Sequence, residues 1–393
     1  MTLDQAEAGQ TVTISVETEN SEASTYEIII LPEDFPVLQA VSYSDAVSTD
    51  PIYVTLRPQG DTLPNYIAKL DNNAVPYFYR QVQGRAADFK IHPATNEASY
   101  LVRLDTENEF GRSNGIAVML DENFNQVETV EVVGLSHTDD HDFAILPDNR
   151  LMLLSYHGSF HNLTDIGLSE QEFVEESVVQ IIDRTTRDIF FEWRSLNGIP
   201  YTDQFYDPPR PEYAHINSAT IDTDGNILAS LRGTSNVVKI DVASGTVLWK
   251  LGGKSNQFQF ENDPFTGPCG QHDVTRLANG NILVFDNGIL CLPEDERGEF
   301  TRVVEYSIDE ANLTAELVWS YSDESQYSRA LGSAQRLDNG NTLIAWGLRQ
   351  DVVPDTLDTV ITEVDNNGEI VFELNSINPL PILIYRAFRF PDQ

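Results

Sequence analysis

Apolar and polar positions repeat along most of this chain in a pattern of short strands joined by tight turns. In residues 219–251 an alternating apolar run leads into Asp224-Gly225, a second apolar run follows, and the unit ends near Trp249. Asp-Gly and Asn-Gly suit two-residue hairpins because a type I′ turn needs positive φ at both central residues. The unit is therefore predicted to form four antiparallel strands.

Related units begin near five positions, which are residues 86, 143, 219, 274 and 334. Residues 64–82 and the C-terminal run 382–390 are expected to supply a sixth unit shared between the two ends of the chain. Recurring four-stranded units are typical of propeller blades, whereas the strands of a β-sandwich do not recur in this way. We predict an all-β fold, a six-bladed β-propeller with a small N-terminal β appendage, closed by pairing of N-terminal and C-terminal strands.

Residues 1–60 are expected to form the appendage, because alternation in Thr11–Val16 and an apolar run at 26–31 suggest a separate hairpin. Residues 61–393 then form the propeller domain. Helices are expected to be scarce, with one short helix at residues 169–176 inside a blade insertion.

The composition allows a sizeable core but excludes some classes of partner. Hydrophobic residues make up 41% of the chain, and 62 Asp and Glu against 24 Lys and Arg give a formal charge of -38. Such a charge repels nucleic-acid phosphates and anionic membrane surfaces, so nucleic acid is not expected as a partner. Apolar runs fall short of the roughly 20 residues that a membrane-spanning helix needs, so membrane insertion is not expected either.

The start of the chain lacks the basic and apolar regions of a signal peptide, so a secreted or periplasmic protein would have lost its signal already. The two cysteines, Cys269 and Cys291, lie on either side of a histidine motif. A disulfide between them would close a loop worth about 3 kcal/mol on the chain-entropy model. Two unpaired buried thiols are the alternative for a cytosolic chain.

Three histidines precede the first strand of successive units, in His141-Asp142, Ala214-His215 and His272-Asp273. The first strand of each propeller blade lines the central channel, so these side chains are expected to meet near the axis. A single histidine is more often a satisfied structural residue, but three at matching positions favour a site. Arg232 follows the second strand of the middle unit, and His and Arg together would bind an anion.

The remaining histidines do not fit this register as well. They are His137, His157 and His161, expected to be structural, and His92, which lies near a unit start but lacks a following Asp.

The motifs resemble those of bacterial arylsulfotransferases that use aryl sulfates as donors. The resemblance covers roughly residues 65 to 393, and its segments are Ala214-His-Ile-Asn-Ser, Leu231-Arg-Gly-Thr-Ser-Asn-Val-Val-Lys-Ile-Asp, Trp249-Lys-Leu-Gly-Gly, Gln271-His-Asp-Val and residues 280–288. It implies a six-bladed propeller that needs neither a nucleotide sulfate nor a metal. It also implies small-molecule partners, an aryl sulfate and a phenolic acceptor.

By motif, His272 matches the family's nucleophile, which accepts the sulfuryl group, and His215, Arg232 and His141 match the groups that stabilise it. The family has a disulfide near its nucleophile, which Cys269 and Cys291 could supply. Four aromatic residues near the motifs are candidates for an aryl pocket, namely Tyr156, Phe160, Tyr206 and Tyr213.

Other functions fit the same pattern. A related propeller could use its His and Arg cluster for elimination or cyclisation with a histidine as base, or could bind an anionic aromatic ligand without catalysis. A metal site made from three histidines is a third option, which the charge of Arg232 opposes. The sequence leaves open the natural donor and acceptor and the oligomeric state.

Overall fold

A computed structural model of the chain describes residues 8–16, 24–60, 64–104, 114–350 and 352–392. In these ranges the regular structure is almost entirely β, and the helical segments are three short 3₁₀ turns at Thr164–Ile166, Tyr201–Asp203 and Arg232–Thr234. Within the same ranges, no helix has the length and apolar character needed to cross a membrane.

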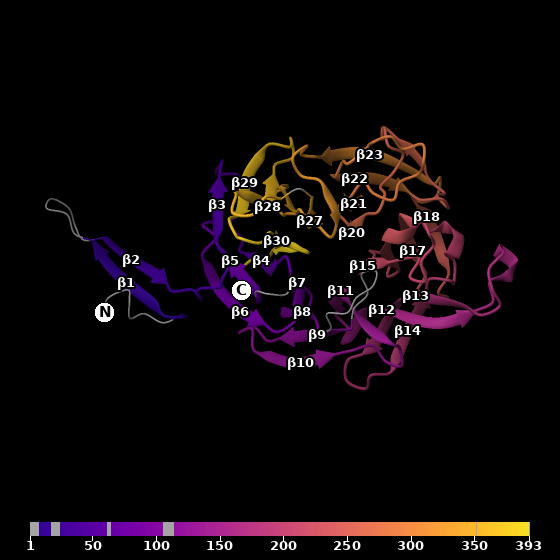
Figure 1. Cartoon of the computed structure of the whole chain (residues 1–393), viewed down its shortest axis with the longest axis horizontal. Helices are drawn as coiled ribbons and strands as arrows, with labels where there is room; N and C mark the ends of the chain where they lie inside the picture. The colour runs from indigo at the N-terminus through magenta and orange to yellow at the C-terminus, as the bar shows by residue number, and fades with distance from the viewer. Residues whose placement is uncertain (1–7, 17–23, 61–63, 105–113, 351, 393) are drawn as a thin grey trace.

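Six antiparallel sheets are arranged in a ring, which confirms the predicted six-bladed β-propeller (Figure 1). The strands of each sheet are given from the inner to the outer edge. The first sheet has β7 (Arg85–His92), β8 (Glu97–Arg103), β9 (Gly115–Leu120) and β10 (Gln126–Val130), and the second has β11 (His137–Ile145), β12 (Arg150–His161), β13 (Glu172–Asp183) and β14 (Ile189–Arg194). The third has β15 (Ile216–Ile221), β16 (Ile227–Leu231), β17 (Asn236–Ile240) and β18 (Val247–Leu251).

The fourth and fifth sheets each have a fifth strand on the outer edge. The fourth sheet has β20 (His272–Arg276), β21 (Ile282–Asp286), β22 (Arg302–Asp309), β23 (Thr314–Tyr321) and β19 (Gln259–Glu261), and β19 runs parallel to β23. The fifth sheet has β25 (Ser333–Arg336), β26 (Thr342–Ala345), β28 (Asp358–Val364), β29 (Ile370–Ser376) and β3 (Leu38–Ser42). Strands β24 (Ser328–Ala330) and β27 (Leu348–Arg349) form a separate two-stranded sheet. In the sequence, β24 comes between β23 and β25, and β27 comes between β26 and β28.

The sixth sheet joins the two ends of the chain, as the sequence predicts. Strand β4 (Ile52–Pro58) pairs on one side with β5 (Asn65–Leu70), which pairs with β6 (Pro76–Val82). On its other side β4 pairs with the C-terminal strands β30 (Ile382–Leu383) and β31 (Ala387–Arg389). Both edges of β4 are thereby hydrogen-bonded to neighbouring strands inside the ring.

The division of the chain at residue 60 does not match the sheets. Strands β3 and β4 both lie within residues 1–60, yet each pairs with propeller strands. Strand β4 is almost wholly buried, as expected for a strand inside a blade. The part of this range that forms its own sheet is the hairpin of β1 (Thr11–Val16) and β2 (Ser24–Ile29), which projects from the ring at the left of Figure 1.

Residues 169–176 do not form the short helix that the sequence predicts. Residues from Glu172 onward belong to β13, which pairs with β12 along twelve residues. Val174 is fully buried in this hairpin, next to Phe160 and Phe173, whose rings pack edge to face. Pairing with a long partner strand outweighs the local helical preference of glutamate.

The inner strands are tied to one another by a repeated hydrogen bond. In four places a side-chain oxygen on one inner strand accepts a hydrogen bond from a backbone N–H of the next inner strand, at 3.0 to 3.3 Å. The acceptor and donor residues are Asp142 and Ala219, Ser218 and Val274, Asp273 and Ala334, and Ser333 and Ala387. These contacts identify equivalent positions in successive blades. On this alignment Arg386, just before Ala387, is the equivalent residue in the sixth blade.

Arg386 neutralises aspartates from three other blades near the propeller axis. Its Nη1 lies 3.1 Å from both Asp88 Oδ1 and Asp142 Oδ1, and its Nε lies 3.5 Å from Asp273 Oδ1. The Nζ of Lys90 adds a second cation, 2.6 Å from Asp88 and 2.7 Å from Asp142. All five groups are buried or nearly so, and such a cluster is stable only while its charges remain paired.

We expect Arg386→Ala to lower the free energy of unfolding by about 3–5 kcal/mol, because it leaves buried carboxylates without their main cation. Urea denaturation measures the loss. The pKa of Asp142 lies far below the ordinary value, since Arg386 and Lys90 outweigh the effect of burial. Without Arg386, burial raises the pKa of these aspartates, so the difference between the two proteins should be largest at neutral pH and above and should shrink as pH falls and the variant's aspartates become protonated.

Arg150→Ala, which removes a partly exposed arginine that pairs with Asp148 at the start of β12, serves as the control and should change stability by no more than about 1 kcal/mol. A similar small loss in Arg386→Ala would contradict the role assigned to the axial charges.

Candidate functional site

The ends of the inner strands bring the predicted site residues together on one side of the axial charge cluster. The ring centroids of His141 and His215 lie 5.3 Å apart. Positive charge on Arg232 and on His141 affects the pKa of His272, so these groups are within electrostatic reach of one another. All three histidines are buried.

The register of the blades places His141 and His272 at equivalent positions, each just before an axial aspartate. Asn217 takes that position in the intervening blade, and His215 stands two residues earlier. His215 reaches the site from there because its φ is 54° and the register of β15 shifts between Ile216 and Ser218. Such a bulge re-aims side chains at the end of a strand.

His272 has a defined tautomer. The amide nitrogen of Asn287 donates to the carbonyls of Ser328 and Leu331 at 2.9 and 3.0 Å, which turns its Oδ1 toward His272. Nδ1–H of His272 therefore donates to this oxygen at 2.7 Å. Nε2 then carries the lone pair, and the Leu331 backbone N–H donates to it at 3.2 Å.

The surroundings of His272 also keep it uncharged. Burial lowers its pKa well below the usual range, and the positive charge of Arg232 lowers it further, while the bond to Asn287 opposes this only in part. A neutral imidazole with a fixed Nδ1–H can act as a nucleophile through Nε2.

His215 and His141 each bond a buried carboxylate instead of an amide. Nδ1 of His215 lies 2.9 Å from Glu212 Oε2, and Nδ1 of His141 lies 2.7 Å from Asp139 Oδ2. Burial lowers the pKa of His215 well below its ordinary value, and positive charge on His141 and Arg232 adds to this. Burial also acts to lower the pKa of His141, but Asp139 outweighs it, so that this pKa is raised.

Arg232 begins a 3₁₀ turn after β16 and is held from two sides. Its Nη1 donates to the Tyr206 hydroxyl at 3.3 Å and its Nη2 to the Arg329 carbonyl at 3.2 Å. Its Nε is buried and has no hydrogen-bond partner among the described residues. A buried donor without a partner is available to an anion.

Two of the four candidate aromatic residues lie at the site. The Tyr156 ring is 6.3 Å from His141 and 6.0 Å from His215, and Tyr206 bonds Arg232. Burial raises the pKa of Tyr206 to about 12, so its hydroxyl stays protonated at neutral pH. Tyr213 instead packs on Tyr201. Phe160 is 65% exposed in the β12–β13 hairpin.

The other histidines make local contacts away from this cluster. Buried His92 bonds the Ser99 hydroxyl through Nε2 and accepts the Ile145 N–H at Nδ1. Half-buried His157 pairs with Ser136, and His161 with Ser159. His137 is exposed at the start of β11.

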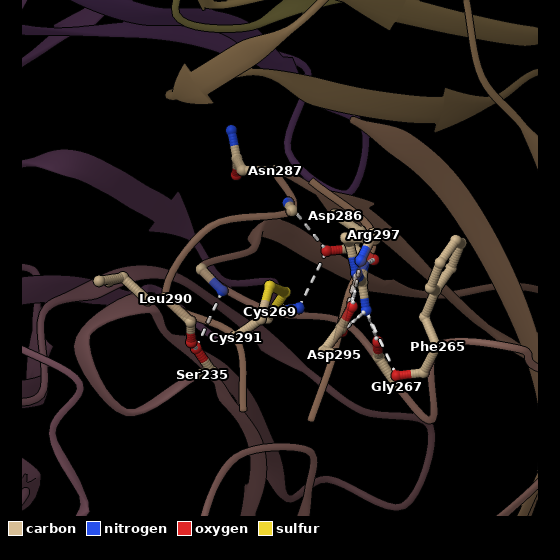
Figure 2. Close-up of a disulfide and its surroundings, with 12 residues drawn as sticks. Ser235, Phe265, Gly267, Cys269, Asp286, Asn287, Leu290, Cys291, Asp295 and Arg297 are labelled. Carbon is tan, nitrogen blue, oxygen red and sulfur yellow. Dashed lines mark hydrogen bonds and ion pairs between the residues drawn. A yellow bond between two sulfur atoms is a disulfide. The ribbon is translucent and has the colours of Figure 1, made fainter. Parts of the chain in front are cut away.

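A disulfide between Cys269 and Cys291 connects the two segments that carry His272 and Asn287 (Figure 2). The Cys269 N–H donates to Asp286 Oδ1 at 2.9 Å, and the Gly288 N–H donates to the Cys269 carbonyl at 3.2 Å. The alternative of two unpaired thiols is therefore excluded. The cross-link, worth about 3 kcal/mol on the chain-entropy model, holds the segment of His272 against the loop that carries Asn287.

Among the described residues, two groups of side chains have the spacing to hold a metal, and the members of each bond one another. Asp139, Asp140 and His141 have potential ligand atoms within 4.8 Å of one another, but His141 bonds Asp139. Cys269 and Cys291 lie near Asp295 in the same way, but their sulfurs form the disulfide.

A cavity of about 1040 Å³ opens on the other side of Arg386. It is lined by the far ends of the inner strands, including Lys90, Arg276, Arg336 and Phe388, and not by the three site histidines. Arg276 is paired with Asp222, and Arg336 with Glu305. With its lining charges balanced, this cavity offers less to an anion than the histidine cluster does.

Sequence reasoning missed several residues that shape the site. Asp139 stands two residues before His141, and Glu212 three before His215, so short carboxylate–histidine spacings could have revealed both. Asn287 lies within the 280–288 motif without having been singled out. Tyr385, whose ring lies 5.7 Å from His141, comes from the C-terminal end of the chain and gave no local signal.

Comparison with known proteins identifies a family for most of the propeller. A model described as Arylsulfotransferase (ASST) matches residues 118–386. Among curated proteins, no sequence matches the chain.

A solved structure shows the same fold at low sequence identity. A protein of unknown function from Bacteroides caccae aligns with a TM-score of 0.52 at 12% identity, covering 86% of this chain and 98% of that one. The periplasmic gluconolactonase PpgL of Pseudomonas aeruginosa aligns with a TM-score of 0.46 at 12% identity, covering 86% of this chain and 99% of that one.

We expect His272 to remain neutral, with its proton on Nδ1, throughout pH 5 to 8, where an ordinary histidine titrates. In Asn287→Asp its pKa should rise, because a carboxylate at Nδ1 favours the imidazolium. Long-range ¹H–¹⁵N spectra of histidine-labelled protein distinguish both tautomers and the cation, and His272→Gln assigns the signal.

Asn287→Leu is the uncharged control, in which His272 should stay neutral but hold its proton on Nδ1 less strongly, because only the Leu331 N–H at Nε2 then favours that tautomer. An imidazolium signal for His272 in the unaltered protein at pH 6 would show that burial and Arg232 do not act as described.

Proposed function

The chain belongs to the arylsulfotransferase family, and on this basis we propose that it moves a sulfuryl group from an aryl sulfate to a phenolic acceptor. The reaction uses no nucleotide sulfate and passes through a sulfohistidine at His272. The observation that carries the proposal is the environment of this histidine, a buried neutral imidazole held by Asn287 and set close to Arg232.

The transfer divides into two displacements. Nε2 of His272 attacks sulfur, the N–S bond forms, and the bond from sulfur to the aryl oxygen breaks with its electron pair leaving on that oxygen. A phenol oxygen then attacks the same sulfur, and the electron pair of the N–S bond returns to Nε2. Covalent catalysis of this kind replaces one difficult step with two easier ones.

The lone pair used for attack is the one that accepts the Leu331 N–H. This hydrogen bond breaks as the N–S bond forms, at modest cost because 3.2 Å is at the long end of the normal range. The freed N–H then lies next to the sulfuryl oxygens and can donate to one of them.

Positive groups surround the position of the transferred group. The guanidinium of Arg232 has a buried Nε–H to offer, and the raised pKa of His141 favours an imidazolium. Both can stabilise charge on the sulfuryl oxygens in the transition state, as cationic clamps do in phosphoryl transfer. In a chain with 62 acidic and 24 basic residues, such a cluster is a local exception.

The disulfide supports a secreted or periplasmic location, because disulfides persist in oxidising compartments and are rare in the cytosol. The high negative charge fits such a setting but does not require it.

We expect the protein to release nitrophenol from 4-nitrophenyl sulfate in a manner that depends on an added phenol, and to gain one sulfuryl mass when the phenol is omitted. His272→Ala should lose both, because it removes the Nε2 atom to which the sulfuryl group is proposed to bind. Absorbance and intact mass follow the two readouts. His137→Ala, which removes an exposed imidazole outside the cluster, should behave like the unaltered protein.

Turnover without an adduct would favour the alternative in which a histidine acts as a base in elimination or cyclisation. Neither turnover nor adduct across several aryl sulfates would favour a binding propeller.

Arg232→Ala should lower kcat/KM for 4-nitrophenyl sulfate by about 10²-fold or more, through lost stabilisation of charge on the sulfuryl oxygens. Steady-state kinetics measures this, and Arg150→Ala is the matched control, at the start of β12 and outside the histidine cluster. A change confined to KM would mean that Arg232 binds the donor without acting in the transition state.

A further inference from the structure

The three site histidines differ in what holds their Nδ1 atom. The pairs are His272 with the Asn287 amide, His215 with Glu212, and His141 with Asp139. An amide oxygen cannot take up a proton at neutral pH, whereas a carboxylate can stabilise a protonated imidazole or share its proton. The last two pairs are therefore able to carry a proton, and the first is not.

The two carboxylate pairs also differ from each other. The raised pKa of His141 favours a lasting imidazolium beside Asp139, which is a fixed positive charge. The pKa of His215 is lowered by burial and by its positive neighbours, so this imidazole rests uncharged. A group that gives and takes protons must change its state during the cycle, which fits His215 better than His141.

Glu212 has the features of a carboxyl group that holds a proton. Its side chain is fully buried, and its Oε1 has no hydrogen-bond partner in the part of the chain that the structure describes. Burial raises the pKa of Glu212 well above the ordinary value, and Arg232 offsets this only in part. The second oxygen lies 2.9 Å from His215 Nδ1, so a proton can be shared between them.

Several charged groups act on this pair. They are His141, His272, Arg232 and Arg210 around His215, and Glu175, Asp139, Arg232 and Arg210 around Glu212. The cations favour loss of a proton from the pair and the acids favour its retention.

We propose that Glu212 and His215 together form the proton carrier of the transfer reaction, giving a proton to the departing aryl oxygen and taking one from the acceptor phenol. The inference rests on the proposed function and adds to it a division of labour among the histidines. His215 contacts the substrate oxygen through Nε2, and Glu212 is a positioning residue that acts through His215.

Protons and electron pairs balance over the cycle. In the first step the Nε2–H of His215 protonates the leaving phenolate, while the proton on Glu212 passes to Nδ1, which leaves a carboxylate beside a neutral imidazole. In the second step Nε2 accepts the proton of the acceptor phenol as its oxygen attacks sulfur, and Glu212 regains its proton from Nδ1. His272 ends as it began, with a proton on Nδ1.

A series of aryl sulfates with leaving groups of increasing basicity tests the proposal. In Glu212→Gln, single-turnover release without an acceptor should fall by about 10²-fold for phenyl sulfate but by less than about threefold for 4-nitrophenyl sulfate, because a weakly basic phenolate departs without a proton. The plot of log rate against the basicity of the leaving group should therefore be steeper than in the unaltered protein. His215→Asn should show the same change in slope.

Glu192→Gln, a partly buried glutamate on outer strand β14, is the control and should keep the original slope. A uniform loss across all donors in Glu212→Gln, with the slope unchanged, would overturn the proton-carrier role and leave the sulfohistidine intact. Failure of the unaltered protein to form an adduct with any donor would instead remove the proposed function. Thermal denaturation of each variant separates these outcomes from misfolding, and His215→Asn provides the slope if Glu212→Gln does not fold.

Discussion

Aspartates from three blades converge near the axis of this propeller, and so much buried negative charge requires a cation in the same place. Arg386 and Lys90 supply it, and Arg386 alone contacts Asp88, Asp142 and Asp273. The arrangement fixes the blades relative to one another, because each carboxylate belongs to a different inner strand. His141 and His272 stand directly next to two of these aspartates, so charge pairing at the axis also sets the positions of these two histidines.

Most of the architecture could be predicted from local pattern. The hairpins between blade strands are marked by turns such as Asp224-Gly225, and alternating apolar runs mark the strands themselves. Two features could not be predicted. The pairing of β3 with β29 joins segments more than 300 residues apart and carries no local signal. Residues 169–176 are rich in glutamate, and their place in a strand depends on the partner strand β12.

The site was predictable as far as the repeat reached. The structure brings His141, His215, His272 and Arg232 together, but His215 does so from a bulge two residues away from the expected position. Partners such as Asn287 and Glu212 lie near motif residues in sequence, and only three-dimensional contacts show what they bond. Their roles in catalysis remain proposals that kinetics and spectroscopy can test.

The closure of the ring has a consequence for how the protein is made. Synthesis proceeds from the N-terminus, so β4, β5 and β6 leave the ribosome long before β31, the strand that completes their sheet. Until Arg386 emerges, the aspartates on the earlier blades have no axial arginine to pair with. A chain that stops before Arg386 therefore leaves these aspartates without their axial arginine and β4 without the strand that closes the ring.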